Sequence, residues 1–177
     1  MPQAIIIGAT SGIGKALARQ LSSDGYSLGI TGRRLHLLEH IKEELDTPVT
    51  IQQMDVADAV SARSQLESLF QEMGKVDLII LNAGYGKRDP ELQWEAEKQT
   101  IDTNVTGFAT LANAAFHCFQ RQGFGHGEVV VVEALMLLAL RHAGVDVEGV
   151  VFAEPLQRRL HAGVVGADAA QHVAAEQ

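Results

Sequence analysis

The fold of this chain is decided by the stretch IIIGATSGIGKAL at residues 5–17. A short apolar run at residues 4–7 leads directly into Gly8, Gly12 and Gly14, and a helix-forming segment follows at once. The pattern predicts a buried strand, a tight turn and a helix whose N-terminus points at the turn. Free N–H groups and the positive end of the helix dipole gather there, and phosphate is the ligand that they favour. We therefore expect a nucleotide-binding turn.

The composition is that of one acidic domain. The 177 residues carry a net charge of −8, and 46% of them are hydrophobic, which is enough for one buried core. Lysine and arginine form no block, which argues against nucleic acid or an anionic membrane as a main partner. The single cysteine, Cys118, fits a reducing compartment, and no apolar run approaches the roughly 20 residues of a membrane span. We expect a soluble, cytoplasmic protein with no signal peptide.

Strands and helices alternate from the N-terminus to about residue 132. The apolar runs predict strands at residues 4–7, 26–31, 49–54, 76–81 and 128–132. Helical spacing predicts helices at residues 15–23, 35–45, 58–73 and 91–122, the last of them interrupted near 104–107. Such alternation indicates an α/β fold, a Rossmann-like doubly wound parallel sheet. We expect one domain at residues 1–132, with its sheet truncated after about the fifth strand.

Individual residues refine these helices. Asp58 is the expected N-cap of the third helix, and Gly74 is the residue expected to end it. The helical pattern places Ala16 on the inner face of the first helix and counts Val60 among the apolar positions of the third. Cys118 lies in an apolar helical run, so we expect it to be a small buried or interface residue.

Residues 133–177 differ in composition from those before them. They contain no Ser, Thr, Asn, Lys, Ile or Tyr and are dominated by Val, Ala, Gly, Leu, Arg and His. This segment is compatible with a helix–strand–helix unit or with a partly disordered segment. A frameshift or another rearrangement of the gene would also produce such a one-sided composition. We expect an atypical C-terminal tail rather than a continuation of the domain.

Two arginines follow the second predicted strand. A dinucleotide-binding fold usually carries an acidic residue about 20 residues after the glycine turn, where it binds the ribose 2′-hydroxyl of NAD. This chain has Arg33 and Arg34 at that place and no Asp or Glu. Because a guanidinium group binds phosphate through paired hydrogen bonds, the arginines favour the 2′-phosphate of NADP(H), with NAD the weaker candidate. The alternative is a solvated loop in which the arginines pair with Glu39 or Glu43.

Further site candidates follow the third and fourth predicted strands. Asp55 and Val56 come after the third strand, and Asn82 comes after the fourth. The carboxyl ends of parallel strands form the ligand-binding edge of an open α/β sheet. An adenine amino group is a suitable donor to Asp55, its ring packs on Val56, and the Asn82 amide is suited to bridging strand ends. Each of these residues is equally suited to a helix cap or a turn.

Together these segments resemble the short-chain dehydrogenase/reductase family. The matching segments keep the family's order and spacing over residues 1 to about 132, and they are Gly8-Ala9-Thr10-Ser11-Gly12-Ile13-Gly14, Gly32-Arg33-Arg34, Asp55-Val56, Asn82-Ala83-Gly84 and Asn104-Val105-Thr106-Gly107. The resemblance implies that NADP(H) is bound by Gly8, Thr10, Ser11, Gly12, Ile13, Gly14, Arg33, Arg34, Asp55, Val56, Asn82, Ala83 and Gly84. It also implies that Asn104 kinks its helix and holds a water of a proton relay, and that the helix around Phe108–Phe119 joins subunits of a homo-oligomer.

The other catalytic residues of that family are missing from this sequence. The family places a serine after the fifth strand and a Tyr-x-x-x-Lys pair on the next helix. There the lysine lowers the pKa of the tyrosine, which is the general acid/base. This chain has only Tyr26 and Tyr85, no Tyr-x-x-x-Lys, no serine after Ser68 and no lysine after Lys98. Asn104 is the one catalytic residue that remains.

The sequence leaves three functions open. The resemblance implies an oxidoreductase that transfers hydride between NADP(H) and a carbonyl or alcohol, and the missing residues predict weak activity or none. The first alternative is a non-catalytic nucleotide-binding or partner protein, and the second is a frameshifted or truncated gene product. Histidines such as His142 and His161 lack an orienting partner for a substitute relay, and no spacing of His or Cys indicates a metal site.

Overall fold

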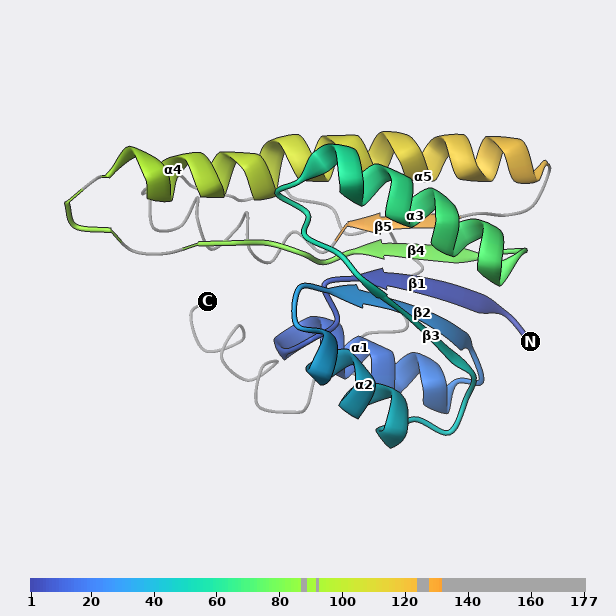
Figure 1. Ribbon diagram of the computed structural model, residues 1–177. Coiled ribbons are helices and arrows are strands. Elements are labelled where there is room, and N and C mark those ends of the chain that lie inside the picture. Colours follow the sequence, from blue (N-terminus) through green and yellow to red (C-terminus); the bar gives the residue numbers. More distant parts are fainter. Residues whose placement is uncertain (87–88, 92, 124–127, 132–177) are drawn as a thin grey trace, which may run out of the picture.

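Five parallel strands form the central sheet of the computed structural model, which describes residues 1–86, 89–91, 93–123 and 128–131. The strands are β1 (Gln3–Ile7), β2 (Ser27–Gly32), β3 (Val49–Gln53), β4 (Leu78–Leu81) and β5 (Glu128–Val131). They lie in the order β3-β2-β1-β4-β5, and every neighbouring pair is parallel (Figure 1). From β1 the chain adds β2 and β3 on one side, and it then returns to add β4 and β5 on the other side of β1. This arrangement confirms the predicted Rossmann-like α/β fold.

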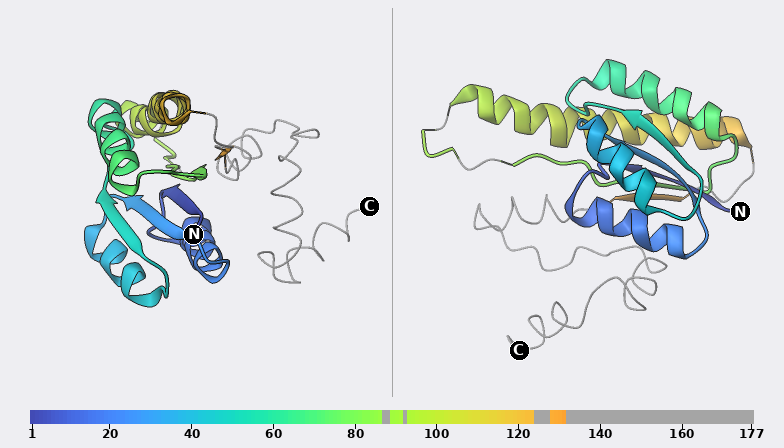
Figure 2. Two further views of the ribbon diagram at one scale, coloured as in Figure 1. Left: turned by 90° about the vertical axis from the view of Figure 1, so that its right-hand side faces the viewer. Right: turned by 60° about the horizontal axis from the view of Figure 1, so that its bottom comes forward.

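Helices cover both faces of the sheet (Figures 1 and 2). On one face lie α1 (Gly12–Ser23) and α2 (Leu35–Glu44), and on the other lie α3 (Ala59–Met73) and α5 (Phe108–Gln122). A further helix, α4 (Trp94–Ile101), continues into α5 through the π-helical segment η1 (Asp102–Gly107). The predicted interruption of the long helix is thus confirmed. It is a π-helical segment, in which each turn contains more residues than a turn of α-helix. Within the described ranges, no helix has the length and apolar character needed to cross a membrane.

Each face of the sheet has its own apolar core. Successive residues of β1 point to opposite faces, so Ile5 and Ile7 join the core under α3 and α5, while Ala4 and Ile6 join the core under α1 and α2. All four residues are at most 1% exposed. Because both faces are covered, the strand is apolar throughout instead of alternating with polar residues.

Gln122 of α5 pairs with the main chain just before β4. The sequence predicted this strand from residue 76, but the strand begins at Leu78. The N–H of Val76 donates to Gln122 Oε1 at 2.9 Å, and the carbonyl oxygen of Val76 accepts from Gln122 Nε2 at 3.0 Å. The side chain at the end of α5 therefore satisfies the main chain of Val76 and anchors the helix to the sheet.

Both predicted end residues of α3 are confirmed. Asp58 Oδ1 accepts a hydrogen bond from the N–H of Ser61 at 3.2 Å, which caps the helix. Hydrogen bonds from the Ser61 hydroxyl and main chain hold the pKa of Asp58 below its usual value. The helix ends at Gly74, which has a φ of 80° that favours glycine.

The predicted inner-face position of Ala16 is wrong, and Val60 does not pack with the other apolar residues of the pattern in α3. Ala16 is exposed because α1 begins at Gly12 and packs through Gly14, Leu17, Ala18 and Leu21, a face that excludes it. Val60 lies in the first turn of α3 and is 83% exposed. The tail predicted at 133–177 lies outside the described residues.

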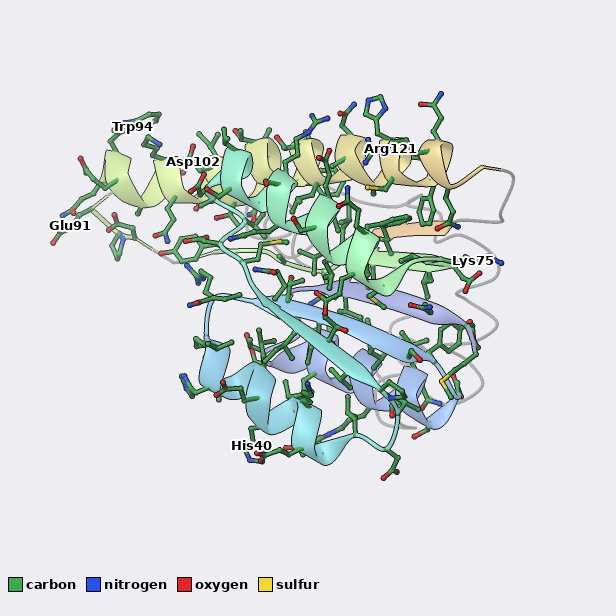
Figure 3. All side chains as sticks on the ribbon, turned by 45° about the vertical axis from the view of Figure 1, so that its right-hand side comes forward. His40, Lys75, Glu91, Trp94, Asp102 and Arg121 are labelled. Atoms are coloured by element: carbon green, nitrogen blue, oxygen red, sulfur yellow. The ribbon has the colours of Figure 1, made fainter. Side chains whose placement is uncertain are left out.

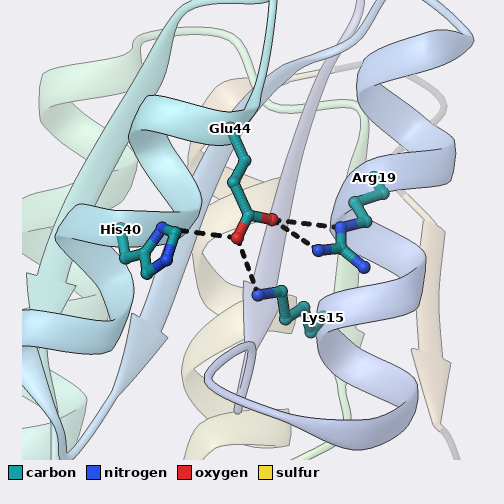
Figure 4. A network of polar contacts seen from close by, with 4 residues as sticks. All are labelled: Lys15, Arg19, His40 and Glu44. Carbon is teal, nitrogen blue, oxygen red and sulfur yellow. Dashed lines mark hydrogen bonds and ion pairs between the residues drawn. The ribbon is translucent and has the colours of Figure 1, made fainter.

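Glu44 ties α2 to α1 (Figure 4). Its carboxylate accepts from Lys15 Nζ at 2.9 Å and from the Arg19 guanidinium at 2.6 and 3.1 Å, both on α1. His40 Nδ1 lies 3.3 Å away, one turn earlier on α2. Hydrogen bonds from Lys15 and Arg19 lower the pKa of Glu44 from 4.5 to about 2. The helix that follows the glycine turn is thereby held to the helix that follows the two arginines.

We expect Glu44→Gln to lower the midpoint of thermal unfolding by a few degrees at neutral pH, because the amide keeps the size of the side chain but loses its charge. Since the folded state lowers the pKa of Glu44 to about 2, the carboxylate stabilises the fold above pH 4.5, and this stabilisation is lost as the pH falls toward 2. Thermal melts of both proteins at successive pH values should converge over that interval. Glu43→Gln is the matched control, and a difference independent of pH would contradict the assignment.

Candidate functional site

The glycine turn joins β1 to α1 at the carboxyl edge of the sheet. The N–H groups of Gly8 and Ala9 donate to the Thr31 carbonyl oxygen at 3.1 and 2.9 Å, which ties the turn to the end of β2. Gly12 opens α1 with a φ of 55°, and no described atom lies within 4 Å of the place where a Cβ would stand. The N-cap residue, Ser11, makes no capping bond through its side chain. The first turn of α1 therefore has uncapped N–H groups beside open space, as a phosphate-binding turn requires.

Gly14 serves packing rather than ligand contact. A Cβ at this position would overlap the carbonyl oxygen of Gly8 and would lie 2.6 Å from Asn82 Nδ2. Asn82 Nδ2 donates to that same Gly8 oxygen at 2.8 Å, and the N–H of Asn82 donates to the Ile7 carbonyl at 3.0 Å. The missing side chain of Gly14 thus lets α1 approach the sheet closely. Gly14 is absent from the lining of the neighbouring cleft, although its motif suggested cofactor contact.

A cleft of about 440 Å³ lies over the carboxyl ends of the strands. Its volume falls within the range of sites for cofactors and other small molecules. The structure brings twelve of the predicted site residues together in its lining, and they are Gly8, Thr10, Ser11, Gly12, Ile13, Arg33, Arg34, Asp55, Val56, Asn82, Ala83 and Gly84. The predicted strand ends therefore meet at one place.

Five lining residues were not assigned to the site from the sequence, and they are Thr31, Gly32, Met54, Tyr85 and Thr103. Each is adjacent in sequence to a predicted site segment, which is the signal that would have found it. Thr31 is fully buried, and its hydroxyl has no hydrogen-bond partner among the described residues. A buried hydroxyl left in this state beside a cleft is suited to a bound molecule that supplies the missing partner.

The two arginines lie at the mouth of the cleft and differ in their contacts. One terminal nitrogen of Arg34 donates to Thr10 Oγ1 at 2.9 Å and to Ser11 Oγ at 3.2 Å. The Arg33 side chain makes no hydrogen bond or ion pair with the described residues. Within that part of the chain, no hydrogen bond or ion pair joins either arginine to Glu39 or Glu43, and both side chains are exposed, as the solvated-loop alternative expects.

Asp55 and Val56 form the wall after β3. Asp55 Oδ1 accepts from the N–H of Ala57 at 3.1 Å, so this side chain supports a turn as well as lining the cleft. Val56 is buried, and Gly107 of η1 packs directly on it, because a Cβ on Gly107 would overlap the Val56 carbonyl oxygen. The π-helical segment therefore supports this wall from behind.

Asn104 supports the part of the lining formed by Tyr85. Its Oδ1 accepts from the N–H of Tyr85 at 2.8 Å, and its Nδ2 donates to the carbonyl oxygen of Tyr85 at 2.7 Å. Both polar atoms of the side chain are thus engaged by one residue of the loop after β4. Asn104 lies in the π-helical segment, as the predicted kink requires, but it does not line the cleft.

Cys118 is buried in the core between α5 and the sheet, which confirms the sequence interpretation. Burial raises the pKa of its thiol, so it stays protonated and unreactive at neutral pH. No group of His, Cys, Asp or Glu among the described residues is arranged to hold a metal ion.

The short chain dehydrogenase model of protein families matches residues 2–136. This match covers the glycine turn, all five strands and every residue that lines the cleft. The chain belongs to the short-chain dehydrogenase family. Members of this family bind a nicotinamide dinucleotide, and the described cleft lies at the edge of the sheet where open α/β folds bind such ligands.

The chain matches only part of the curated relatives that resemble it. An "uncharacterized oxidoreductase" of Myxococcus xanthus is 34% identical over 128 residues, which cover 70% of this chain and 51% of the relative. The sulfoacetaldehyde reductase of Chromohalobacter salexigens is 38% identical over 114 residues, which cover 62% of this chain and 45% of that protein. The chain thus spans about half the length of the curated relatives it matches.

Solved structures of the family match the same part of the chain. The alcohol dehydrogenase of Thermococcus sibiricus, complexed with 5-hydroxy-NADP, superposes with a TM-score of 0.65 at 33% identity, over 74% of this chain and 57% of that chain. A short-chain type dehydrogenase/reductase of Mycobacterium marinum superposes with a TM-score of 0.68 at 27% identity, over 73% and 54% of the two chains. Both matches agree with the Rossmann-like fold of the described residues.

We expect Asn104→Ala to lower the free energy of unfolding by about 2 kcal/mol, because it removes two hydrogen bonds of about 1 kcal/mol each from a half-buried main chain. Urea unfolding measures this loss. Asn113→Ala, at an exposed site on α5 with one long hydrogen bond at 3.4 Å, is the matched control and should change little. Equal effects of the two variants would contradict a bracing role for Asn104.

Proposed function

We propose that this chain binds NADP(H) in the cleft and prefers it to NAD(H). The observation that carries the proposal is the pair Arg33 and Arg34 in the cleft lining, at the place where NAD-binding folds carry an acidic residue. Arg34 is also the N-cap residue of α2, whose first turn has no acidic side chain and no capping side-chain bond. Two guanidinium groups and a helix N-terminus favour an additional phosphate.

The lining residues suit the parts of this cofactor. The uncapped first turn of α1 suits the pyrophosphate, and Arg33 suits the 2′-phosphate. Asp55 and Val56 suit the adenine, through a carboxylate acceptor and an apolar surface. Asn82, Ala83 and Gly84 lie along the end of β4 and suit the remaining ribose and nicotinamide. When bound, the cofactor supplies hydride chemistry, and the residues of this chain bind and orient it.

We further propose that the 177-residue chain transfers hydride weakly or not at all. By family it is an oxidoreductase that works between NADP(H) and a carbonyl or alcohol. Tyr85 lines the cleft, but the residue four positions after it is Asp89 rather than a lysine. A positioned general acid or base contributes about 10² to 10⁴ in rate, and this sequence lacks the family's pair. Asn104 also has both side-chain atoms engaged by Tyr85.

The binding proposal predicts that NADPH binds at least about tenfold more tightly than NADH, a difference of about 1.4 kcal/mol. Titration followed by nicotinamide fluorescence measures both dissociation constants. Gly12→Ala should weaken NADPH binding by about tenfold because its new methyl group stands where the cofactor approaches the turn.

Gly25→Ala is the matched control, since Gly25 has a φ of 83° and, like Gly12, no described atom within 4 Å of its Cβ position, but it lies outside the cleft lining. Equal affinity for the two dinucleotides would contradict the NADP(H) preference. Equal losses in the two alanine variants would contradict the location of the site.

A second proposal concerns association with another copy of this chain. Trp94, Ile101, Val105 and Phe116 are 64%, 43%, 59% and 63% exposed on the continuous α4–η1–α5 helix. Trp94 and Ile101 lie on α4, Val105 lies in η1 and Phe116 lies on α5, so exposed apolar side chains recur along the length of this helix. Figure 3 shows Trp94 projecting from α4 away from the sheet. Exposed apolar side chains along this length are suited to an isologous contact with the same side chains of a second subunit.

We expect Phe116→Asp to convert a dimer into a monomer, because it places an unpaired charge in a desolvated contact. Light scattering after size-exclusion chromatography measures the mass. Leu35→Asp, which changes an exposed apolar residue on the opposite face of the sheet, is the control and should leave the dimer intact. A wild-type chain that remains monomeric at 100-fold the working concentration would contradict this contact.

A further inference from the structure

We infer that the two arginines have different roles: Arg33 binds the 2′-phosphate, and Arg34 is a positioning residue that holds the glycine turn against the loop after β2. This inference rests on the proposed binding of NADP(H) and goes beyond it. It concerns how the cleft keeps its shape before any cofactor arrives.

Arg34 is already engaged by the glycine turn. One of its terminal nitrogens donates to Thr10 Oγ1 at 2.9 Å and to Ser11 Oγ at 3.2 Å. A terminal guanidinium nitrogen carries two hydrogens, so both donors of this atom are used within the protein. The three other N–H donors of Arg34, on Nη1 and Nε, make no hydrogen bond with the described residues, so Thr10 and Ser11 fix one end of the guanidinium at the turn.

Two other contacts join the same pair of loops. The Gly8 and Ala9 N–H groups donate to the Thr31 carbonyl oxygen at 3.1 and 2.9 Å. The Thr10 methyl group packs over Gly32, where a Cβ would come within 2.5 Å of it. The bonds from Arg34 therefore complete a junction that already has main-chain and van der Waals contacts. These two bonds hold the side chains of Thr10 and Ser11 in place on the glycine turn.

Arg33 has the opposite arrangement. Its carbonyl oxygen accepts from Gln53 Nε2 at 2.9 Å, so its main chain is held to the end of β3. Its exposed side chain makes no hydrogen bond or ion pair with the described residues. All five of its N–H donors are thus available to a phosphate, from a main chain that is already in place.

The two roles have different signatures in binding. NADH lacks the 2′-phosphate and otherwise has the same groups as NADPH. Loss of a phosphate ligand therefore weakens NADPH binding alone, and loss of a positioning residue weakens the binding of both dinucleotides by the same factor. The ratio of the two dissociation constants separates the roles.

The experiment measures dissociation constants of NADPH and NADH for the wild type, Arg33→Ala and Arg34→Ala by fluorescence titration of the full chain. Arg33→Ala should weaken NADPH binding by about tenfold or more and leave NADH within about twofold, as expected for a lost hydrogen-bonded charge. Arg34→Ala should weaken both by the same factor, about three- to tenfold, and preserve their ratio. A selective loss of NADPH affinity in Arg34→Ala would overturn the inference while leaving the proposed cofactor in place.

A second measurement needs no cofactor. Thr10→Val keeps the methyl contact with Gly32 and removes the hydroxyl that accepts from Arg34. In thermal melts of the unliganded chain, Thr10→Val and Arg34→Ala should each lower the midpoint, and the double variant should lower it by less than their sum. Arg33→Ala should leave the midpoint unchanged and should add independently to Thr10→Val. Additive effects of Thr10→Val and Arg34→Ala would overturn the positioning role, even if the wild type bound neither dinucleotide and the proposed function failed.

Discussion

The contact of Asn82 with the Gly8 carbonyl, beside the missing side chain of Gly14, is the constraint on which the cleft depends. This hydrogen bond of 2.8 Å joins the ends of β1 and β4, and no side chain fits between it and the first turn of α1. The helix is therefore held close to the sheet edge. This approach holds the uncapped N–H groups of its first turn close to the carboxyl edge of the sheet.

The remaining walls of the cleft are held by contacts within the protein. Gly107 packs on the Val56 carbonyl, and Asn104 holds the main chain of Tyr85, so one π-helical segment supports two lining residues. Arg34 joins the turn to the loop after β2. A site held in this way loses little conformational freedom when a ligand binds, which favours affinity.

The sequence predicted the five strands, their parallel arrangement, the glycine turn and most of the residues that line the cleft, because those features follow from local patterns. Buried parallel strands are apolar, and their carboxyl ends meet at one edge whatever the details of packing. The contacts that join distant residues were not predictable in this way. The pairing of Gln122 with Val76, and that of Asn104 with Tyr85, leave no periodic signal. The error at Ala16 arose because the packed face of α1 includes Gly14, whose close approach to Gly8 and Asn82 leaves no periodic apolar signal.

We propose that the glycine turn and Arg33 together form the binding site of an NADP(H) molecule. The most direct test is a nuclear magnetic resonance titration of the isotope-labelled chain with NADPH. The account predicts saturable shifts of the main-chain amides of Gly12 and Ile13 and of the side-chain Nε–Hε of Arg33, with little change at Gly25, outside the cleft lining. Absence of saturable shifts at the glycine turn at millimolar NADPH would contradict the account.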